Sequence, residues 1–141
     1  MRLAITVIAT ICASFHVLGI AAPRNECPDV IRPAAVQVEM YGWQSYIEFP
    51  LRLSSAGVAA GPPDMRAGLK GERISKRSEL EVTVFRFGET GFEQGKWLVC
   101  SYGQGGEISL HKRLPENLKA CTVSYQTPAK APRQSIRIDC E

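Results

Sequence analysis

The feature that most constrains the fold of this chain is a set of cysteines that follows an export-type N-terminus. Residues 1–22 begin with a single charge at Arg2, continue as an apolar run and end in the small residues Ala21 and Ala22. This order is typical of a cleaved secretory signal peptide, whereas a membrane span needs about 20 apolar residues and polar side chains interrupt this run. We therefore expect a secretory signal peptide at 1–22 and a single β-rich domain at 23–141.

Four of the five cysteines lie in the expected domain, because Cys12 belongs to the signal peptide. An even number of cysteines in an exported chain predicts disulfides, here two, and a location in the periplasm or outside the cell. The four are Cys27, Cys100, Cys121 and Cys140.

Composition and charge exclude several classes of protein. The chain has 141 residues, of which 45% are hydrophobic and 22% charged, as in one ordinary globular domain. Lys and Arg number 17 against 14 Asp and Glu, and removal of Arg2 with the signal peptide leaves 16 against 14, a net charge of +2. That balance is too weak for a nucleic-acid surface, and it gives no steering toward a basic partner. We expect no nucleic-acid partner and no membrane span after signal cleavage.

Apolar and polar residues alternate along much of the domain, which predicts half-buried strands. The expected strands are 36–40, 47–53, 80–84, 96–102, 107–112, 121–126 and 135–140. Pro50 places its strand at a sheet edge or a bulge, and the glycines at 103–106 predict a hairpin turn. The fold class is therefore mainly β: an antiparallel β sandwich or small barrel of about seven strands, tied by disulfides.

Residues 54–78 do not follow this alternation, because they are rich in Gly, Ala and Pro. We expect an ordered surface loop there, with one or two helical turns at 64–69. The basic side chains of this segment, Arg73, Lys76 and Arg77, are candidates for partner binding, although a solvated loop is the simpler interpretation.

A hairpin register favours one disulfide pairing. If Gln126 lies opposite Ser135, counting along both strands places Cys121 opposite Cys140, and both cysteines share the apolar faces of their strands. Cys27 and Cys100 then form the second bond. The alternative of Cys100–Cys121 with Cys27–Cys140 stays open, since spacing alone excludes no pairing.

Groups that could support catalysis are few in the expected domain. His111 is its one histidine, and we place it on the polar face of a strand, while the cysteines are expected to be oxidised. The sequence has no Gly-x-Ser-x-Gly elbow, phosphate loop, dinucleotide motif or Cys-x-x-Cys pair. We therefore expect no enzyme activity, no metal and no cofactor.

Aromatic residues between the predicted strands are better candidates for a functional role. Tyr41 and Trp43 flank Gly42, and Phe92 follows a glycine-rich turn. Aromatic side chains on loops often anchor protein interfaces. A position in the core is the alternative interpretation for Tyr41 and Trp43.

Several motifs occur in order along the domain and together resemble a known family. They are Cys27-Pro28, Gly42-Trp43, the stretch from Gly57 through Pro62-Pro63 to Leu69, Trp97 to Tyr102, Leu114-Pro115, and Cys121 to Tyr125. The domain resembles a family of small exported proteobacterial proteins of unassigned activity that are encoded in or near type VI secretion loci. These motifs are cysteines and aromatic strand residues, so the resemblance specifies fold better than function and assigns no functional residue.

What the resemblance implies is a periplasmic immunity protein that blocks a peptidoglycan-degrading toxin, either an amidase or a lysozyme-like enzyme. The alternative function is a structural or ligand-binding module of the cell envelope without inhibitor activity. An inhibitor needs anchoring side chains on accessible segments. The candidates are Tyr41, Trp43, Arg73, Lys76, Arg77 and Phe92.

Overall fold

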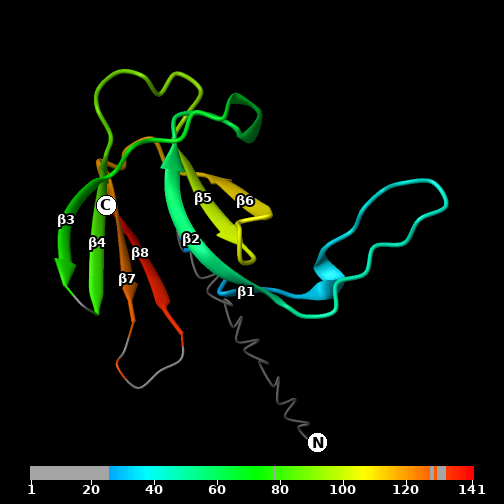
Figure 1. Cartoon of the computed structure of the whole chain (residues 1–141). Helices are drawn as coiled ribbons and strands as arrows, with labels where there is room; N and C mark the ends of the chain where they lie inside the picture. Colours follow the sequence, from blue (N-terminus) through cyan, green and yellow to red (C-terminus); the bar gives the residue numbers. More distant parts are fainter. Residues whose placement is uncertain (1–25, 78, 128, 130–132) are drawn as a thin grey trace, which may run out of the picture.

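Two four-stranded antiparallel sheets form the fold in a computed structural model, which describes residues 26–77, 79–127, 129 and 133–141 (Figure 1). The first sheet has the order β1-β2-β5-β6 and comprises β1 (Val30–Ile31), β2 (Leu51–Ala59), β5 (Trp97–Tyr102) and β6 (Ile108–Arg113). The second has the order β3-β4-β7-β8 and comprises β3 (Glu72–Arg77), β4 (Leu80–Arg86), β7 (Ala120–Gln126) and β8 (Ser135–Cys140). Two short 3-10 turns, η1 (Pro33–Ala35) and η2 (Pro63–Met65), complete the described elements.

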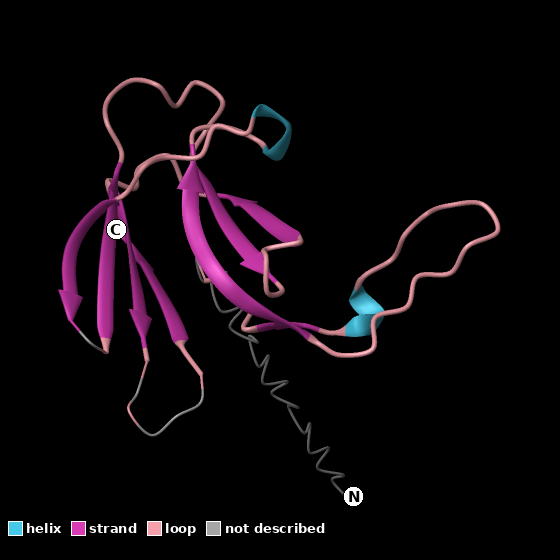
Figure 2. Ribbon diagram, viewed as in Figure 1, coloured by secondary structure: helices cyan, strands magenta, loops and turns pink. Residues whose placement is uncertain are grey.

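The core lies between the two sheets and follows the alternation of β5 and β7 (Figure 2). Leu98, Cys100 and Tyr102 of β5 point into it, as do Cys121 and Val123 of β7. Four of these five side chains have no exposed surface, and Cys100 is nearly as buried. The arrangement is a β sandwich, not a closed barrel, so the predicted mainly antiparallel β fold is confirmed and the barrel alternative is wrong.

Most of the predicted strands are present, but three expectations about the N-terminal half are wrong. Residues 36–40 form no strand, β2 begins only at Leu51, and β2 and β3 take up both ends of the expected loop at 54–78, over 54–59 and 72–77. The helical content of that loop is limited to η2. Small residues such as Ala56 and Gly57 misled the prediction because β2 crosses close to the second sheet, where small side chains fit.

The edge of β2 that faces away from β5 is paired by several short segments, which lie far apart in the sequence. β1 pairs with only two of its residues, and Leu53 donates its N–H to the carbonyl of Asp29 at 2.9 Å. Further along, the Tyr125 hydroxyl accepts from the N–H of Ala56 at 3.2 Å and donates to its carbonyl at 3.0 Å. Leu69 then donates its N–H to the carbonyl of Val58 at 2.8 Å. These contacts satisfy backbone groups that an open edge would leave unpaired.

Two disulfides tie the sandwich together. Cys121 and Cys140 lie directly opposite each other in β7 and β8, with Cα atoms 4.1 Å apart, in the register that also places Gln126 opposite Ser135. Cys27 is bonded to Cys100 of β5, with Cα atoms 5.7 Å apart. This is the pairing that the hairpin register favours, and the alternative of Cys100–Cys121 with Cys27–Cys140 is not the one formed.

The expected signal peptide at 1–22 lies outside the described residues. Within the part that is described, no helix is long and apolar enough to cross a membrane.

Tyr102 combines complete burial with one polar contact. Its hydroxyl donates to the carbonyl of Pro28 at 2.8 Å, which links β5 to the segment before β1. Burial raises the pKa of Tyr102 to about 12, and the nearby carboxylate of Asp29 adds to the rise. The neutral phenol is therefore the form that the fold stabilises.

We predict that Tyr102→Phe lowers the free energy of unfolding by about 1 kcal/mol at neutral pH, because the hydrogen bond to Pro28 is lost. The unfolded phenol ionises near pH 10 and the folded one near 12, so the stability that the wild type gains from this group is complete below pH 10 and is lost as pH rises through 12. Urea unfolding at pH 8 and pH 11 should show the gap between the two proteins shrinking. Tyr46→Phe, which alters an exposed hydroxyl, should leave stability unchanged. A gap independent of pH would contradict the assignment.

Candidate functional site

A long excursion between η1 and β2 is the most distinctive surface feature of the molecule. We call residues 36–50 the arm, and Figure 1 shows it reaching away from the sheets on the side opposite β3. Few hydrogen bonds hold its shape: the Ser45 hydroxyl donates to the carbonyl of Val36 at 3.1 Å, and the Trp43 N–H donates to the carbonyl of Met40 at 3.0 Å. Gly42 turns the chain between them with a φ of 79°, a conformation that favours glycine.

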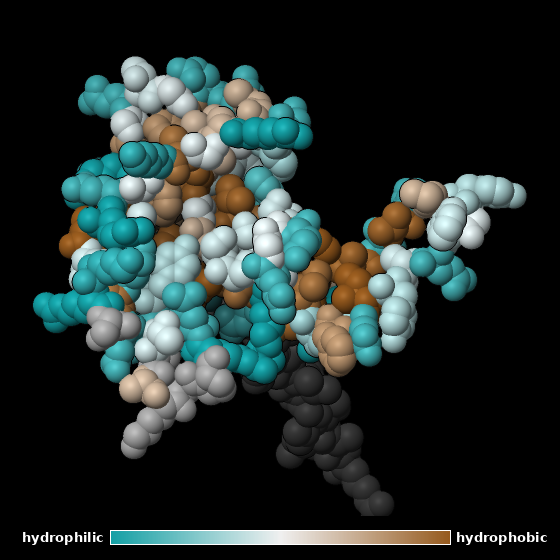
Figure 3. Space-filling model, in the orientation of Figure 1, coloured by the Kyte–Doolittle hydropathy of each residue, from teal (hydrophilic) through white to brown (hydrophobic). Residues whose placement is uncertain are grey.

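The arm exposes most of its large apolar side chains. Each of six such residues has more than half of its surface exposed, and Tyr41 is fully exposed. Figure 3 shows hydrophobic surface on the arm and at its junction with the body. Single exposed apolar residues are normal, but a continuous group of them marks a binding surface. The six are Val38, Met40, Tyr41, Trp43, Tyr46 and Phe49.

A shallow groove of about 640 Å³ runs along the base of the arm. Its apolar wall comes from Tyr46, Phe49 and Leu53, and its other wall from the β5–β6 turn with Gly103, Glu107 and Ile108. Glu107 is held within that turn, because its carboxylate accepts the N–H of Gly105 at 3.2 Å. Arm and groove together offer a largely apolar surface that can bind a partner by contact.

Sequence reasoning identified Tyr41 and Trp43 as interface candidates but missed Met40, Tyr46 and Phe49. Met40 and Phe49 alternate with polar neighbours, which predicts strands at 36–40 and 47–53, because period-two patterning does not say whether the chain itself covers the apolar face; Tyr46 lies between the two predicted strands. The crowding of four aromatic residues within 41–49, beside a glycine, is the sequence feature that could have found them.

The basic candidates lie elsewhere, on the edge strand β3. Arg73 forms an ion pair with Glu81 of β4, with 2.8 Å between Nε and a carboxylate oxygen. Lys76 and Arg77 are exposed on the same strand, and a bulge interrupts its pairing between Arg73 and Ser75. Positive charges and bulges are the usual protection of an edge strand against pairing with other chains. The arm and β3 lie on opposite sides of the molecule, so one small cleft on a partner cannot meet both (Figure 1).

Phe92 belongs to a cluster that fastens the loop after β4. Its ring packs edge-on against Phe87, with centroids 5.4 Å apart, and the ammonium of Lys96 lies 4.9 Å from the Phe87 centroid. Lys96 is buried and donates to the carbonyls of Glu116 and Leu118, both at 2.6 Å. Phe92 thus packs against another ring of the chain, whereas Tyr41 and Trp43 at the tip of the arm are exposed.

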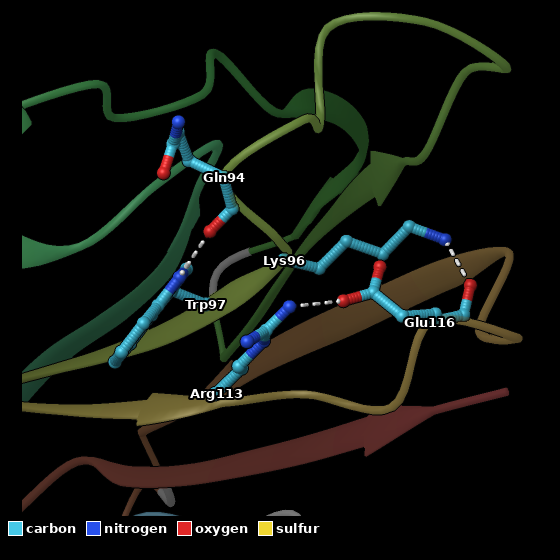
Figure 4. Close-up of polar contacts among 5 residues, drawn as sticks. All are labelled: Gln94, Lys96, Trp97, Arg113 and Glu116. Carbon is cyan, nitrogen blue, oxygen red and sulfur yellow. Dashed lines mark hydrogen bonds and ion pairs between the residues drawn. The ribbon is translucent and has the colours of Figure 1, made fainter.

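Neighbouring contacts extend the same cluster (Figure 4). Arg113 pairs with the carboxylate of Glu116 at 2.9 Å, and the Trp97 indole N–H donates to the carbonyl of Gln94 at 3.0 Å. A buried lysine that donates to two carbonyls and lies beside two rings has a structural role.

His111 is less exposed than its expected place on a polar strand face suggests. It is half-buried, its Nε2 lies 3.0 Å from the Ser109 hydroxyl, and its Nδ1 is buried without a hydrogen-bond partner among the described residues. The segment with Pro62, Pro63 and Arg66 lines a hollow over this face of β6, which explains the burial. Within the described ranges, no group of three or more His, Cys, Asp or Glu residues is placed to hold a metal ion.

Comparison with known proteins gives one family. A family model described as Type VI secretion system Tli immunity protein matches residues 48–141, which is more than half of the chain. The match spans β2 to β8, and thus nearly all of both sheets, and it begins within the arm. No curated protein and no solved structure matches the chain significantly.

We predict that truncation of Trp43 changes the stability of the protein little, whereas truncation of Phe92 lowers it clearly. Trp43→Ala should change the free energy of unfolding by less than about 0.5 kcal/mol, because 73% of the side chain's surface is already exposed. Phe92→Ala should lower it by about 2 kcal/mol, since the ring leaves Phe87 and Lys96 without their contact. Urea unfolding followed by circular dichroism measures both. A strong loss of stability in Trp43→Ala would place Trp43 in the core.

Proposed function

The chain belongs to the type VI secretion system Tli immunity protein family, and from that premise we propose that it neutralises a cognate toxin in the periplasm by seating its arm in the toxin's cleft. An immunity protein acts by binding a toxin that would otherwise damage the cell that makes it. The proposal specifies a binding element, a cellular compartment and a class of toxin.

The observation that carries the choice of binding element is the exposure of the arm. Residues whose apolar side chains stay in water cost free energy unless a partner covers them. Tyr and Trp are also the residues that most often supply the dominant contacts of an interface, because they bury a large area at a small cost in side-chain entropy. Tyr41 and Trp43 at the tip are therefore the proposed anchors, with Tyr46 and Phe49 lining the groove behind them.

The two disulfides and the N-terminal pattern support the periplasm as the compartment. Structural disulfides persist in oxidising environments, and residues 1–22 have the order of a signal peptide. A toxin that must be neutralised there acts on the cell envelope. We propose a peptidoglycan-degrading hydrolase, an amidase or a lysozyme-like enzyme, as the class to test first.

The chemistry of the arm favours a second candidate class. A cleft for glycan and peptide strands is largely polar, whereas the exposed side chains of the arm are apolar. An envelope hydrolase whose cleft accommodates acyl chains would offer a more complementary surface. Assays of toxin activity on purified peptidoglycan and on phospholipid vesicles separate the two classes.

We predict that Tyr41→Ser/Trp43→Ser weakens binding to the toxin by at least about 2 kcal/mol, or about 30-fold in Kd, while thermal stability stays within a few degrees of wild type. The toxin to test is the product of any effector gene that adjoins this one, and calorimetry of the purified pair measures Kd. Inhibition of the effector on its substrate should fall in parallel.

Lys76→Gln/Arg77→Gln is the matched control, because it removes two exposed charges on the far side of the molecule and keeps both partners of the Arg73–Glu81 ion pair. We expect this variant to bind as wild type does. If it loses binding and the arm variant retains it, the interface lies on β3 and the arm is not the binding element.

A further inference from the structure

The two ends of the arm are attached to the body by very different means. At its C-terminal end the arm continues directly into β2, a nine-residue strand that pairs with β5 over most of its length. At its N-terminal end it leads back through η1 to β1, which has two residues and pairs only with Arg52 and Leu51. A ladder of two residues is too short to hold a strand in place by itself.

Burial of Ile31 in the core helps to hold this N-terminal end, and two bonds come from neighbouring inward positions of β5. Cys27 is covalently bonded to Cys100, and the Tyr102 hydroxyl donates to the carbonyl of Pro28 at 2.8 Å. In addition, the N–H of Leu53 donates to the carbonyl of Asp29 at 2.9 Å. The disulfide is the one link among these that water cannot replace.

The rest of the sandwich does not depend on the N-terminal segment for its ladders. The second sheet contains no residue before Glu72, and β2, β5 and β6 pair with one another without β1. The other disulfide, Cys121–Cys140, joins β7 to β8 within the second sheet. The two bonds therefore have separable roles.

We propose that the Cys27–Cys100 disulfide positions the arm, so that binding of the toxin requires this bond and does not require Cys121–Cys140. The proposal rests on the proposed function of the arm. It also makes immunity dependent on oxidation: two thiols give two electrons and two protons to the disulfide of an oxidising protein, which is released as a dithiol while the Cys27–Cys100 bond forms. Protein that has not met such an oxidant would not hold its arm in the binding position.

The test compares Cys27→Ser/Cys100→Ser with Cys121→Ser/Cys140→Ser in the exported protein. Hydrogen exchange followed by mass spectrometry reports arm attachment without any toxin. In the first variant, exchange in segments 27–35 and 51–53 should rise by at least about tenfold, and by more than exchange in β7. In the second, the increase should be concentrated in β7 and β8. Equal protection of 27–35 and 51–53 in the first variant and in wild type would overturn the proposal.

Binding to the toxin used with the arm variants provides the functional part of the test. Affinity should fall by at least about tenfold in Cys27→Ser/Cys100→Ser and stay at the wild-type value in the folded fraction of Cys121→Ser/Cys140→Ser. Equal losses in both variants would also overturn the proposal. If wild type itself does not bind the effector, the proposed function fails, and hydrogen exchange still decides whether the bond positions the arm.

Should Cys27→Ser/Cys100→Ser fail to fold, Cys27→Ala/Cys100→Ala offers a second route to the same answer. It breaks the same bond and places no hydroxyl in the core, where both cysteines are buried. Exchange in segments 27–35 and 51–53 should again rise by more than exchange in β7, and protection equal to that of wild type would overturn the proposal.

Discussion

The inward row of β5 is the part of the structure on which the rest depends. Leu98 packs into the core between the sheets, Cys100 bonds to Cys27, and Tyr102 binds the carbonyl of Pro28. One strand thus supplies both the centre of the hydrophobic core and the attachment of the N-terminal segment. Because β5 lies between β2 and β6, its position is fixed on both sides by ladders. A rigid body of this kind can hold an arm that has little structure of its own.

The arm departs from the rule that a small domain buries its large apolar residues. Its exposed aromatic side chains bury little surface on folding, and the few hydrogen bonds within the arm do not account for its length. A partner that covers the arm accounts for both features. Membership of an immunity protein family supplies the kind of partner, a toxin, and a protruding apolar segment is a shape suited to filling a concave site.

The sequence was a good guide wherever alternation and turn chemistry agreed with the environment in the folded protein. The hairpin of β7 and β8 is the clearest case, since its register placed Cys121 opposite Cys140 from pattern alone. Prediction from the sequence failed where one pattern fits both a buried strand and an exposed segment. Val38, Met40 and Phe49 alternate with polar residues as in a half-buried strand, but their side chains are exposed. It also failed at β2 and β3, where glycine and alanine serve close packing and charged residues form a sheet edge. Such placements are decided by contacts between distant segments, which local patterns do not contain.

The central claim, that the arm is the surface covered by the toxin, can be tested most directly by methionine oxidation in the free protein and in its complex with the toxin. Met40 on the arm and Met65 in η2 are similarly exposed, at 57% and 50%, so Met65 serves as the internal reference in each sample. Oxidation of Met40 should slow by at least about tenfold on binding while that of Met65 is unchanged, because a buried thioether is screened from the oxidant. Met40 that is oxidised equally fast in the free protein and in the complex would contradict the account.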